Sequence, residues 1–143
     1  MSCKNKNYKS AQVAFNTVAQ DVVATGTSLA VLGTLTTDTG CSINTNNAGF
    51  KVNASGLYRF RYVITFTAAA AGTATVQLFK DGIALPCTLT QNTVADGDTY
   101  TIITEAPAIV IGTCCNICPS VTASVSGVAG TVNYVCASAV RLA

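Results

Sequence analysis

Three cysteines stand close together in Cys114-Cys115-Asn116-Ile117-Cys118, the most unusual motif of the sequence. Thiolates at this spacing can hold zinc, form a redox pair or crosslink chains. A structural zinc site takes four ligands, and because the sequence has no His, the fourth would have to be a distant Cys87 or Cys136. A redox pair needs the start of a helix in a βαβ unit, which the sequence does not predict.

We therefore expect no metal and no cofactor, and we interpret the thiols as candidates for disulfides or crosslinks, with a loop of reduced thiols as the alternative. The chain has seven cysteines, an odd number, so at least one thiol stays free or pairs between chains. No apolar segment follows the polar start of the sequence, so we expect no export signal, and oxidation would follow release of a particle or spore from the cell. The candidates are Cys3, Cys114, Cys115 and Cys118.

Side chains that usually carry catalysis are scarce. The absence of His excludes triad hydrolases and His-based zinc enzymes. The carboxylates are scattered, and no spacing among them makes a paired acid and base. Asp96-Gly97-Asp98 could offer oxygens to calcium, but with two carboxylates it is better interpreted as a tight turn between strands. We expect a protein that is not an enzyme.

Charged residues are few and unevenly placed. Lys and Arg number eight and Asp and Glu six among 143 residues, and three of the lysines fall within the first nine. The rest of the chain has no basic excess, so we expect no nucleic-acid partner, and no apolar run is long enough to span a membrane. Residues 1–11 are interpreted as a flexible basic arm, either a plain tail or an anchor that docks on an acidic capsid or coat surface. The candidate anchor residues are Lys4, Lys6, Tyr8 and Lys9.

The sequence predicts that β-strands form the fold that positions these cysteines and charged residues. Over 56–67 large apolar residues alternate with polar ones, which predicts a half-buried strand. Asp81-Gly82 predicts a hairpin turn after a strand over 73–80, and Pro107 predicts an edge or a break in the strand over 99–111. About eight to ten short strands with turns between them, and no amphipathic helix, predict an all-β sandwich or barrel. The other strands are expected over 12–18, 29–35, 49–53, 83–85, 121–125 and 131–142.

Five short motifs follow one another along the chain: Val13-Ala14-Phe15-Asn16, Gly49-Phe50, Gly56-Leu57-Tyr58-Arg59-Phe60, Leu78-Phe79-Lys80-Asp81-Gly82 and Val140-Arg141-Leu142. Together they resemble the tumour necrosis factor-like or complement-head jelly roll, in particular its bacterial and phage branch. That branch includes the C-terminal domains of collagen-like exosporium glycoproteins and phage head-fibre or decoration proteins. The resemblance covers residues 12–143 and implies an antiparallel jelly-roll sandwich that forms a homotrimer. The sequence departs from the family in having no collagen stalk and in its cysteine cluster.

The strand over 56–67 carries one face of bulky rings. A thin sandwich cannot bury such a face unless a second sheet or a neighbouring subunit covers it. We therefore expect these rings at the core or at the interface of the trimer. They are Tyr58, Phe60, Tyr62 and Phe66.

These expectations favour a non-catalytic structural protein of a phage virion surface, made in the host cytoplasm. It would be a trimeric capsid decoration or head-fibre protein that displays a jelly-roll knob and is attached to a capsid or other particle-surface protein through its N-terminal arm. One alternative is a spore-surface protein of the exosporium type. Another is a trimeric module that binds a host-surface glycan or receptor, although the sequence has no Trp to support sugar binding.

Overall fold

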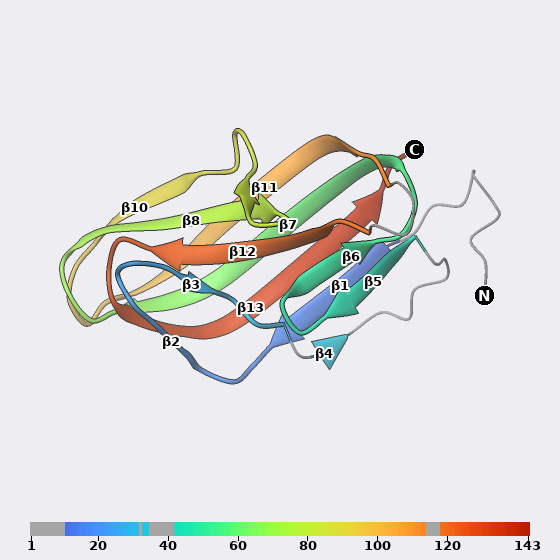
Figure 1. Ribbon diagram of the computed structural model, residues 1–143. Helices are drawn as coiled ribbons and strands as arrows, with labels where there is room; N and C mark the ends of the chain where they lie inside the picture. Colours follow the sequence, from blue (N-terminus) through green and yellow to red (C-terminus); the bar gives the residue numbers. More distant parts are fainter. Residues whose placement is uncertain (1–10, 32, 35–41, 114–117) are drawn as a thin grey trace.

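Regular structure in this chain consists of β-strands alone over the residues that the computed structural model describes, which are 11–31, 33–34, 42–113 and 118–143 (Figure 1). The abundance of Thr, Val and Ile and the alternation of apolar and polar residues favour extended chain over helix. The strands are β1 (Ala11–Asn16), β2 (Gln20–Val22), β3 (Thr27–Ser28), β4 (Gly33–Thr34), β5 (Ile43–Asn46), β6 (Gly49–Val52), β7 (Gly56–Ala68), β8 (Gly72–Lys80), β9 (Ile83–Ala84), β10 (Thr90–Val94), β11 (Thr99–Ile111), β12 (Ser120–Ser126) and β13 (Gly130–Arg141).

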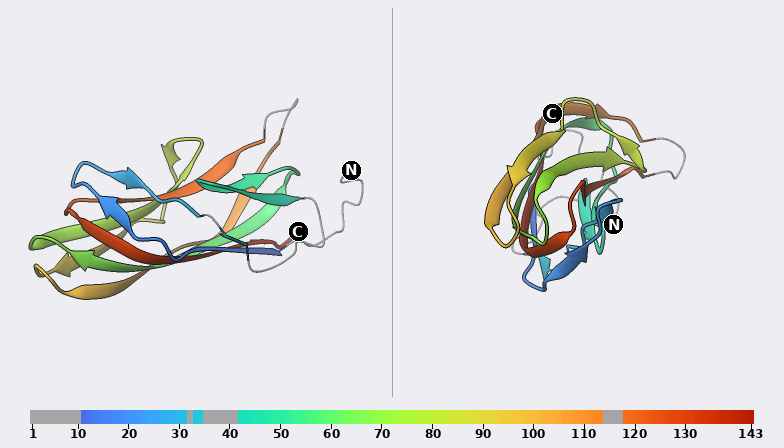
Figure 2. Two further views of the ribbon diagram at one scale, coloured as in Figure 1. Left: turned by 90° about the horizontal axis from the view of Figure 1, so that it is seen from below. Right: turned by 90° about the vertical axis from the view of Figure 1, so that its left-hand side faces the viewer.

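The strands form two antiparallel sheets that pack face to face (Figure 2). One is a 6-stranded sheet in the order β11-β7-β13-β1-β4, with β2 paired to β13. The other is a 7-stranded sheet in the order β10-β8-β12-β6-β5, with β3 paired to β12 and β9 to β8. Most neighbours in a sheet are far apart in sequence, as expected for a jelly roll rather than a meander.

The long strands give the sandwich two distinct ends. At one end, which we call the terminal end, β7 begins beside the C-terminal residue, since Leu57 N donates to Ala143 O at 2.9 Å. β1 enters at the same end, because Ala11 pairs with Val140. At the opposite end, the far end, β7 finishes at the turn before β11, where Ala68 N donates to Asp98 O at 3.0 Å.

The bulky side chains of β7 lie in the core between the sheets, with exposed fractions of 0% for Tyr58, Phe60, Tyr62 and Phe66. The second sheet covers them: the ring of Phe50 on β6 lies 6.0 Å from that of Phe60 and 6.1 Å from that of Tyr62, centre to centre. Of the two places expected for these four rings, the core or an interface between subunits, the structure shows the core. A single chain already encloses them, so no area of theirs is left for another copy to bury.

The turn signals of the sequence are confirmed. Asp81 and Gly82 join β8 to β9 with φ of 50° and 81°, which is typical of a two-residue hairpin. Asp96-Gly97-Asp98 forms the tight turn between β10 and β11. Around Pro107 the register of β11 on β7 shifts between Ala106 and Ile109, and β11 is an edge strand. Pro lacks an N–H for the ladder, which explains both features.

Two parts of the expected strand list differ from the structure. The segment over 29–35 is expected as one strand, but its described part contains only β4, preceded by β3. Leu29 and Val31 are buried nonetheless, and their N–H groups donate to Ala123 O on β12 and to Asn47 O in the turn between β5 and β6. Because these two carbonyl acceptors belong to different segments, Leu29 and Val31 cannot both be paired with one neighbouring strand. The sequence analysis also missed the short strands β2 and β3, and it missed β5 and β10, which are rich in Asn, Thr and Gln.

Candidate functional site

The outward side of the 6-stranded sheet, which we call the open face, carries an apolar row that crosses four strands. The strand pairing aligns one residue from each strand. Val63 on β7 lies between Ile103 on β11 and Cys136 on β13, and Cys136 is paired on its other side with Phe15 on β1. Directly paired residues of antiparallel strands project to the same side of a sheet. Ile103 is 43% exposed, and the other three side chains are half-buried by their neighbours on the same face.

Rows of a different character flank the apolar row. Toward the terminal end, Glu105 stands opposite Arg61, and Arg61 opposite Ser138. Toward the far end, Thr101 stands opposite Thr65, and Thr65 opposite Tyr134, which is 38% exposed. No other described strand packs over this side of the sheet, so the open face is a mixed surface with an apolar centre.

The outward side of the 7-stranded sheet has a different composition. On β12 the outward residues alternate with buried Val and Ala, and they are hydroxyl-bearing. Their partners on β8 are amide or hydroxyl side chains and one half-buried ring, Phe79. This surface suits contact with water, whereas the open face does not. The polar residues on these two strands are Ser120, Thr122, Ser124, Ser126, Thr75 and Gln77.

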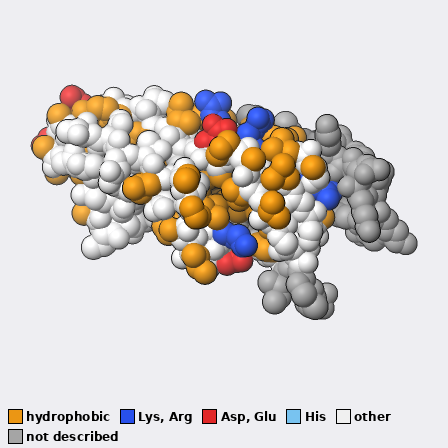
Figure 3. Space-filling model, turned by 90° about the horizontal axis from the view of Figure 1, so that it is seen from above, with side chains coloured by type: hydrophobic (Ala, Val, Ile, Leu, Met, Phe, Trp, Pro, Cys, Tyr) orange, Lys and Arg blue, Asp and Glu red, His pale blue; other side chains and the backbone are white. Residues whose placement is uncertain are grey.

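The edge of the sandwich between β8 and β11 is also apolar. The segment Leu85–Leu89 crosses this edge and is pinned by Thr88, whose hydroxyl donates to Leu85 O at 2.8 Å and whose carbonyl accepts from Thr104 Oγ1. Ile83 is 74% exposed and Leu89 is 52% exposed beside it. We call Ile83, Leu85 and Leu89 the apolar edge; Figure 3 looks onto this side and shows hydrophobic side chains gathered over its middle.

The terminal end is closed by Arg141, the last residue of β13. Its guanidinium is buried and donates from Nη1 to Ser42 Oγ at 3.1 Å and from Nη2 to Ser55 O at 2.8 Å. A Cβ at Gly56 would lie 2.8 Å from Arg141 Nε, so glycine leaves room for the side chain. Burial raises the pKa of the neighbouring Tyr58, partly offset by the positive charge of Arg141. Arg141 therefore joins three segments that are distant in sequence.

Replacing Arg141 by Met is expected to lower the free energy of unfolding by about 2 kcal/mol, since two hydrogen bonds from a charged donor are lost. Urea unfolding followed by circular dichroism measures the change. Lys51→Met serves as the control, because Lys51 is exposed on β6 and its loss should cost less than about 0.5 kcal/mol. Equal stability of the Arg141→Met protein and the wild type would show that Arg141 does not close this end.

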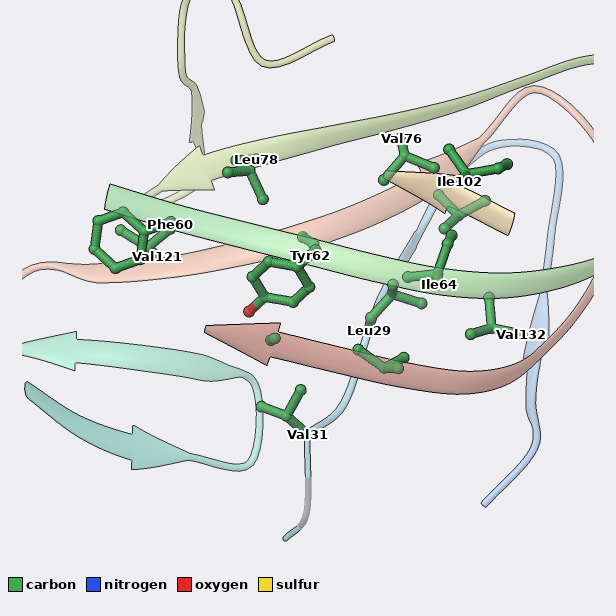
Figure 4. Packing of buried hydrophobic residues seen from close by; sticks show 14 of the residues in the cluster. Leu29, Val31, Phe60, Tyr62, Ile64, Val76, Leu78, Ile102, Val121 and Val132 are labelled. Carbon is green, nitrogen blue, oxygen red and sulfur yellow. The ribbon is translucent and has the colours of Figure 1, made fainter. Parts of the chain in front are cut away.

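The buried hydroxyl of Tyr62 is one of two, with that of Thr45, that have no hydrogen-bond partner in the described part of the chain. Tyr62 Oη lies in the core, and a Cβ on Gly49 of β6 would come within 3.1 Å of it. Figure 4 shows the Tyr62 ring among Phe60, Ile64 and Leu78 between the sheets. Burial raises the pKa of Tyr62 well above its usual value of 10.0. The hydroxyl is therefore a cost to folding rather than a functional proton donor.

Replacing Tyr62 by Phe is expected to raise the free energy of unfolding by about 1 kcal/mol, because it removes the buried hydroxyl at this position that has no hydrogen bond. The folded-state pKa of Tyr62 is above the unfolded value, so the wild type loses stability as the pH rises above about 10. This loss should be shallower in the variant. Tyr100→Phe is the matched control: Tyr100 Oη accepts from Ala95 N at 2.9 Å, and its removal should destabilise. An equal loss of stability in both variants would contradict the prediction.

The thiols that the sequence singled out fall into two groups. Cys118 is described and is a half-buried free thiol, as is Cys136 on the open face, while Cys87 is a free thiol exposed on the apolar edge. The candidates Cys3, Cys114 and Cys115 lie outside the described residues, as do the anchor candidates Lys4, Lys6, Tyr8 and Lys9. Among described residues no group of three or more Cys, Asp or Glu could hold a metal ion.

The chain continues into the cysteine cluster from the terminal end. Thr113, the residue before the cluster, is held there, since its N–H donates to Ser55 Oγ at 2.9 Å. Pro119, just after it, accepts from Val52 N at 2.8 Å. The sequence could not reveal this placement, because it depends on contacts between residues more than fifty positions apart. The open face was missed for the same reason: its apolar row takes one residue from each of four strands.

Two antiparallel sheets that pack face to face in this strand order form a jelly-roll sandwich, the fold of TNF-like and C1q-like proteins. The resemblance that the five sequence motifs indicate is confirmed at the level of the fold. In the described part of the chain no helix has the length and hydropathy of a membrane span.

Three solved structures illustrate the likeness. PRD1 vertex protein P5 is 14% identical with a TM-score of 0.63, over 94% of this chain and 97% of that one. Murine APRIL is 10% identical with a TM-score of 0.67, over 94% and 100%. The globular domain of zebrafish complement 1qA is 8% identical with a TM-score of 0.56, over 94% and 98%. No protein-family model matches the sequence, and no curated relative matches it.

Proposed function

We propose that this chain is a non-catalytic structural protein of a phage virion surface, a homotrimeric capsid decoration or head-fibre protein. Its jelly roll forms the displayed knob, and residues 1–11 attach it to a capsid or other particle-surface protein. The observation that carries the proposal is the apolar row across the open face, from Ile103 to Phe15, because a surface protein with no other copy against it would leave this row in water.

The dimensions of the open face support assembly from several copies. Three strands of about 40 Å (β7, β11 and β13) and β1 of about 20 Å, spaced about 4.8 Å apart, present roughly 700 Å². A stable interface takes about 800 Å² from each partner. The apolar edge formed by Ile83, Leu85 and Leu89 is a second apolar surface that another copy could cover. If the apolar edge of each copy packs on the open face of the next, three copies close into a ring. The polar outer side of the 7-stranded sheet would then face water.

The particle context is supported by the likeness to PRD1 vertex protein P5, a phage protein that matches this chain over nearly the full length of both. The residues support a structural role over catalysis. The sequence has no His, and the carboxylates of the described chain are spread along its whole length. A vertex or surface protein needs a stable shape and an attachment point, and neither requires a reactive group.

Two measurements test the proposal. Light scattering of the purified chain should give the mass of three copies, and a monomer at micromolar concentration would refute the trimer. An antibody against the chain should label intact virions of the source phage in electron micrographs and should co-sediment with them. Labelling of spores instead would support the alternative of a spore-surface protein, for which the family resemblance to exosporium domains is the reason.

A binding module remains the second alternative, in which the knob recognises a host-surface glycan or receptor. The polar outer side of the 7-stranded sheet, with its Ser, Thr and Gln side chains, is the specific feature in its favour, since such groups hydrogen-bond sugars. A glycan array probed with the trimer decides between the two. Specific binding that is lost in Gln77→Ala would favour the module, and silence across the array would favour a purely structural role.

A further inference from the structure

Arg59 on the open face carries a charge that the described part of its own chain does not balance. It is exposed on β7, where it stands opposite Val140 on β13. On its other side the register of β11 is interrupted between Ala106 and Ile109, so no residue of β11 is paired with it. Among the described residues no hydrogen bond or ion pair involves its guanidinium.

The proposed trimer would cover this charge. Arg59 projects to the same side of β7 as Val63, the centre of the apolar row. A guanidinium that loses its water without gaining a partner is strongly unfavourable, whereas a pair of opposite charges in good geometry offsets much of that cost. A stable trimer with a covered open face therefore needs a carboxylate at this place on the neighbouring copy.

Few carboxylates of the chain can fill this role. Glu105 is the direct cross-strand partner of Arg61, so it already faces a cation of its own chain. Asp38 lies outside the described residues. Asp81 is in the hairpin turn between β8 and β9, beside the apolar edge, and is exposed. The remaining three carboxylates lie at the far end of the sandwich, and they are Asp21, Asp96 and Asp98.

Thr88 links the two sheets at the apolar edge and gives a common scale along the sandwich. Its Oγ1 accepts from Leu78 N on β8 at 3.2 Å, and its carbonyl accepts from Thr104 Oγ1 on β11. Thr104 is in turn the direct partner of Tyr62 on β7. Leu78 in one sheet is therefore level with Tyr62 in the other.

Asp81 and Arg59 lie at one level on this scale. β7 runs from the terminal end to the far end, and β8 runs back toward the terminal end (Figure 1). Asp81 comes three residues after Leu78, and Arg59 comes three residues before Tyr62. Both therefore lie about 10 Å from the Leu78–Tyr62 level, in the direction of the terminal end.

The two apolar surfaces are level as well. Thr90 Oγ1 donates to Ile103 O at 3.0 Å, so Leu89, the residue before Thr90, lies beside the Ile103 end of the apolar row. In a ring closed around an axis parallel to the long strands, rotation alone relates one copy to the next, so residues at one level meet. When Leu89 packs at the level of the apolar row of the next copy, Asp81 arrives at the level of Arg59.

We propose that Asp81 of each copy forms an ion pair with Arg59 of the next copy. Asp81 Oδ1 accepts from Ser120 N at 2.9 Å, which holds the carboxylate in place and leaves Oδ2 for the guanidinium. The pair balances Arg59 where the open face is covered, and it sets the level at which the edge of one copy packs on the face of the next. This inference rests on the proposed homotrimer and adds the residues that fix its register.

A double-mutant cycle tests the pair, with the dissociation constant of the trimer measured by light scattering over a dilution series of the full chain. The variants are Asp81→Asn, Arg59→Gln and the two together. Asn keeps the oxygen that accepts from Ser120 N and tolerates the φ of 50° at this position, so the hairpin is retained. Each single variant is expected to raise the dissociation constant about tenfold or more. The double variant should stay within about threefold of the weaker single, because one pair is lost only once.

Arg61→Gln is the matched control, because Arg61 lies on the same side of the same strand but faces Glu105 of its own chain. Its effect on the dissociation constant should multiply with that of Asp81→Asn. If the effects of Arg59→Gln and Asp81→Asn also multiply, or if the trimer is indifferent to both, the pair is wrong while the trimer stands. A wild-type chain that scatters as a monomer at micromolar concentration would overturn the trimer and the ion pair together.

Discussion

Replacing Val63 by Asp is expected to leave the chain folded and to separate the proposed trimer into monomers. Val63 stands at the centre of the apolar row, between Ile103 and Cys136, and is half-buried in one chain. In a monomer the new carboxylate still reaches water, so the cost to folding is about 1 kcal/mol. In a trimer each copy would bury an unpaired charge, and the dissociation constant should rise about a hundredfold or more. Light scattering at micromolar concentration measures the change.

Thr75→Asp is the matched control for this experiment. Thr75 is half-buried near the middle of β8, on the outward side of the 7-stranded sheet, opposite Ser126 on β12 and Gln91 on β10. It adds the same charge to the same kind of strand, and this variant should remain trimeric. A trimeric Val63→Asp protein with a wild-type melting temperature would show that the open face is not the interface. Dissociation of both variants would attribute the effect to net charge instead of position.

Replacing Gly127 by Ala is expected to cost about 3 kcal/mol of stability or more. Gly127 lies in the turn between β12 and β13 with φ of 91°, where an L side chain costs about 1–2 kcal/mol. A Cβ there would also overlap the carbonyl oxygen of Thr73 on β8, and overpacking adds about 1–3 kcal/mol. The backbone of β8 cannot move aside without breaking its ladder. Urea unfolding measures the loss of free energy of unfolding, and we also expect a lower yield of soluble protein.

Gly97→Ala separates the cost of a positive φ from the cost of the overlap with Thr73. Gly97 has φ of 84°, close to that of Gly127, but a Cβ there would meet nothing within 4 Å. This variant should therefore lose only the conformational cost, about 1–2 kcal/mol. If both variants lose the same amount, close approach of Thr73 is not what requires glycine at 127. If Gly127→Ala is as stable as the wild type, the turn has another conformation.

Local features of the fold could be predicted because they depend on neighbouring residues. The alternation over 56–67 correctly predicts which side of β7 is buried, and Asp81-Gly82 and Pro107 correctly predict a hairpin and an irregular edge strand. The strand β10 was missed because its outward residues are Gln and Thr, so no apolar alternation marks it. The segment over 29–35 was misread as one strand because burial of Leu29 and Val31 resembles strand alternation without the ladder.

The candidate surfaces, unlike these local features, could not be predicted from the sequence. Val63, Cys136 and Phe15 are unremarkable in sequence, and only the register of three strands places them side by side. Likewise Asp21 and Asp98, far apart in the chain, come to the same end of the sandwich. Cross-strand pairs between distant segments set both arrangements, and composition cannot reveal them.

By itself the sequence determined that this protein is rich in β-strands joined by tight turns and has no His for catalysis, because strand alternation, turn residues and composition are local or summed properties. Only the tertiary structure decided that the rings of β7 are enclosed by the second sheet of the same chain. It also decided that the exposed side of β7 is the opposite side, which carries Val63. The physical reason is that a strand has two sides, and which side is covered depends on where the other sheet packs.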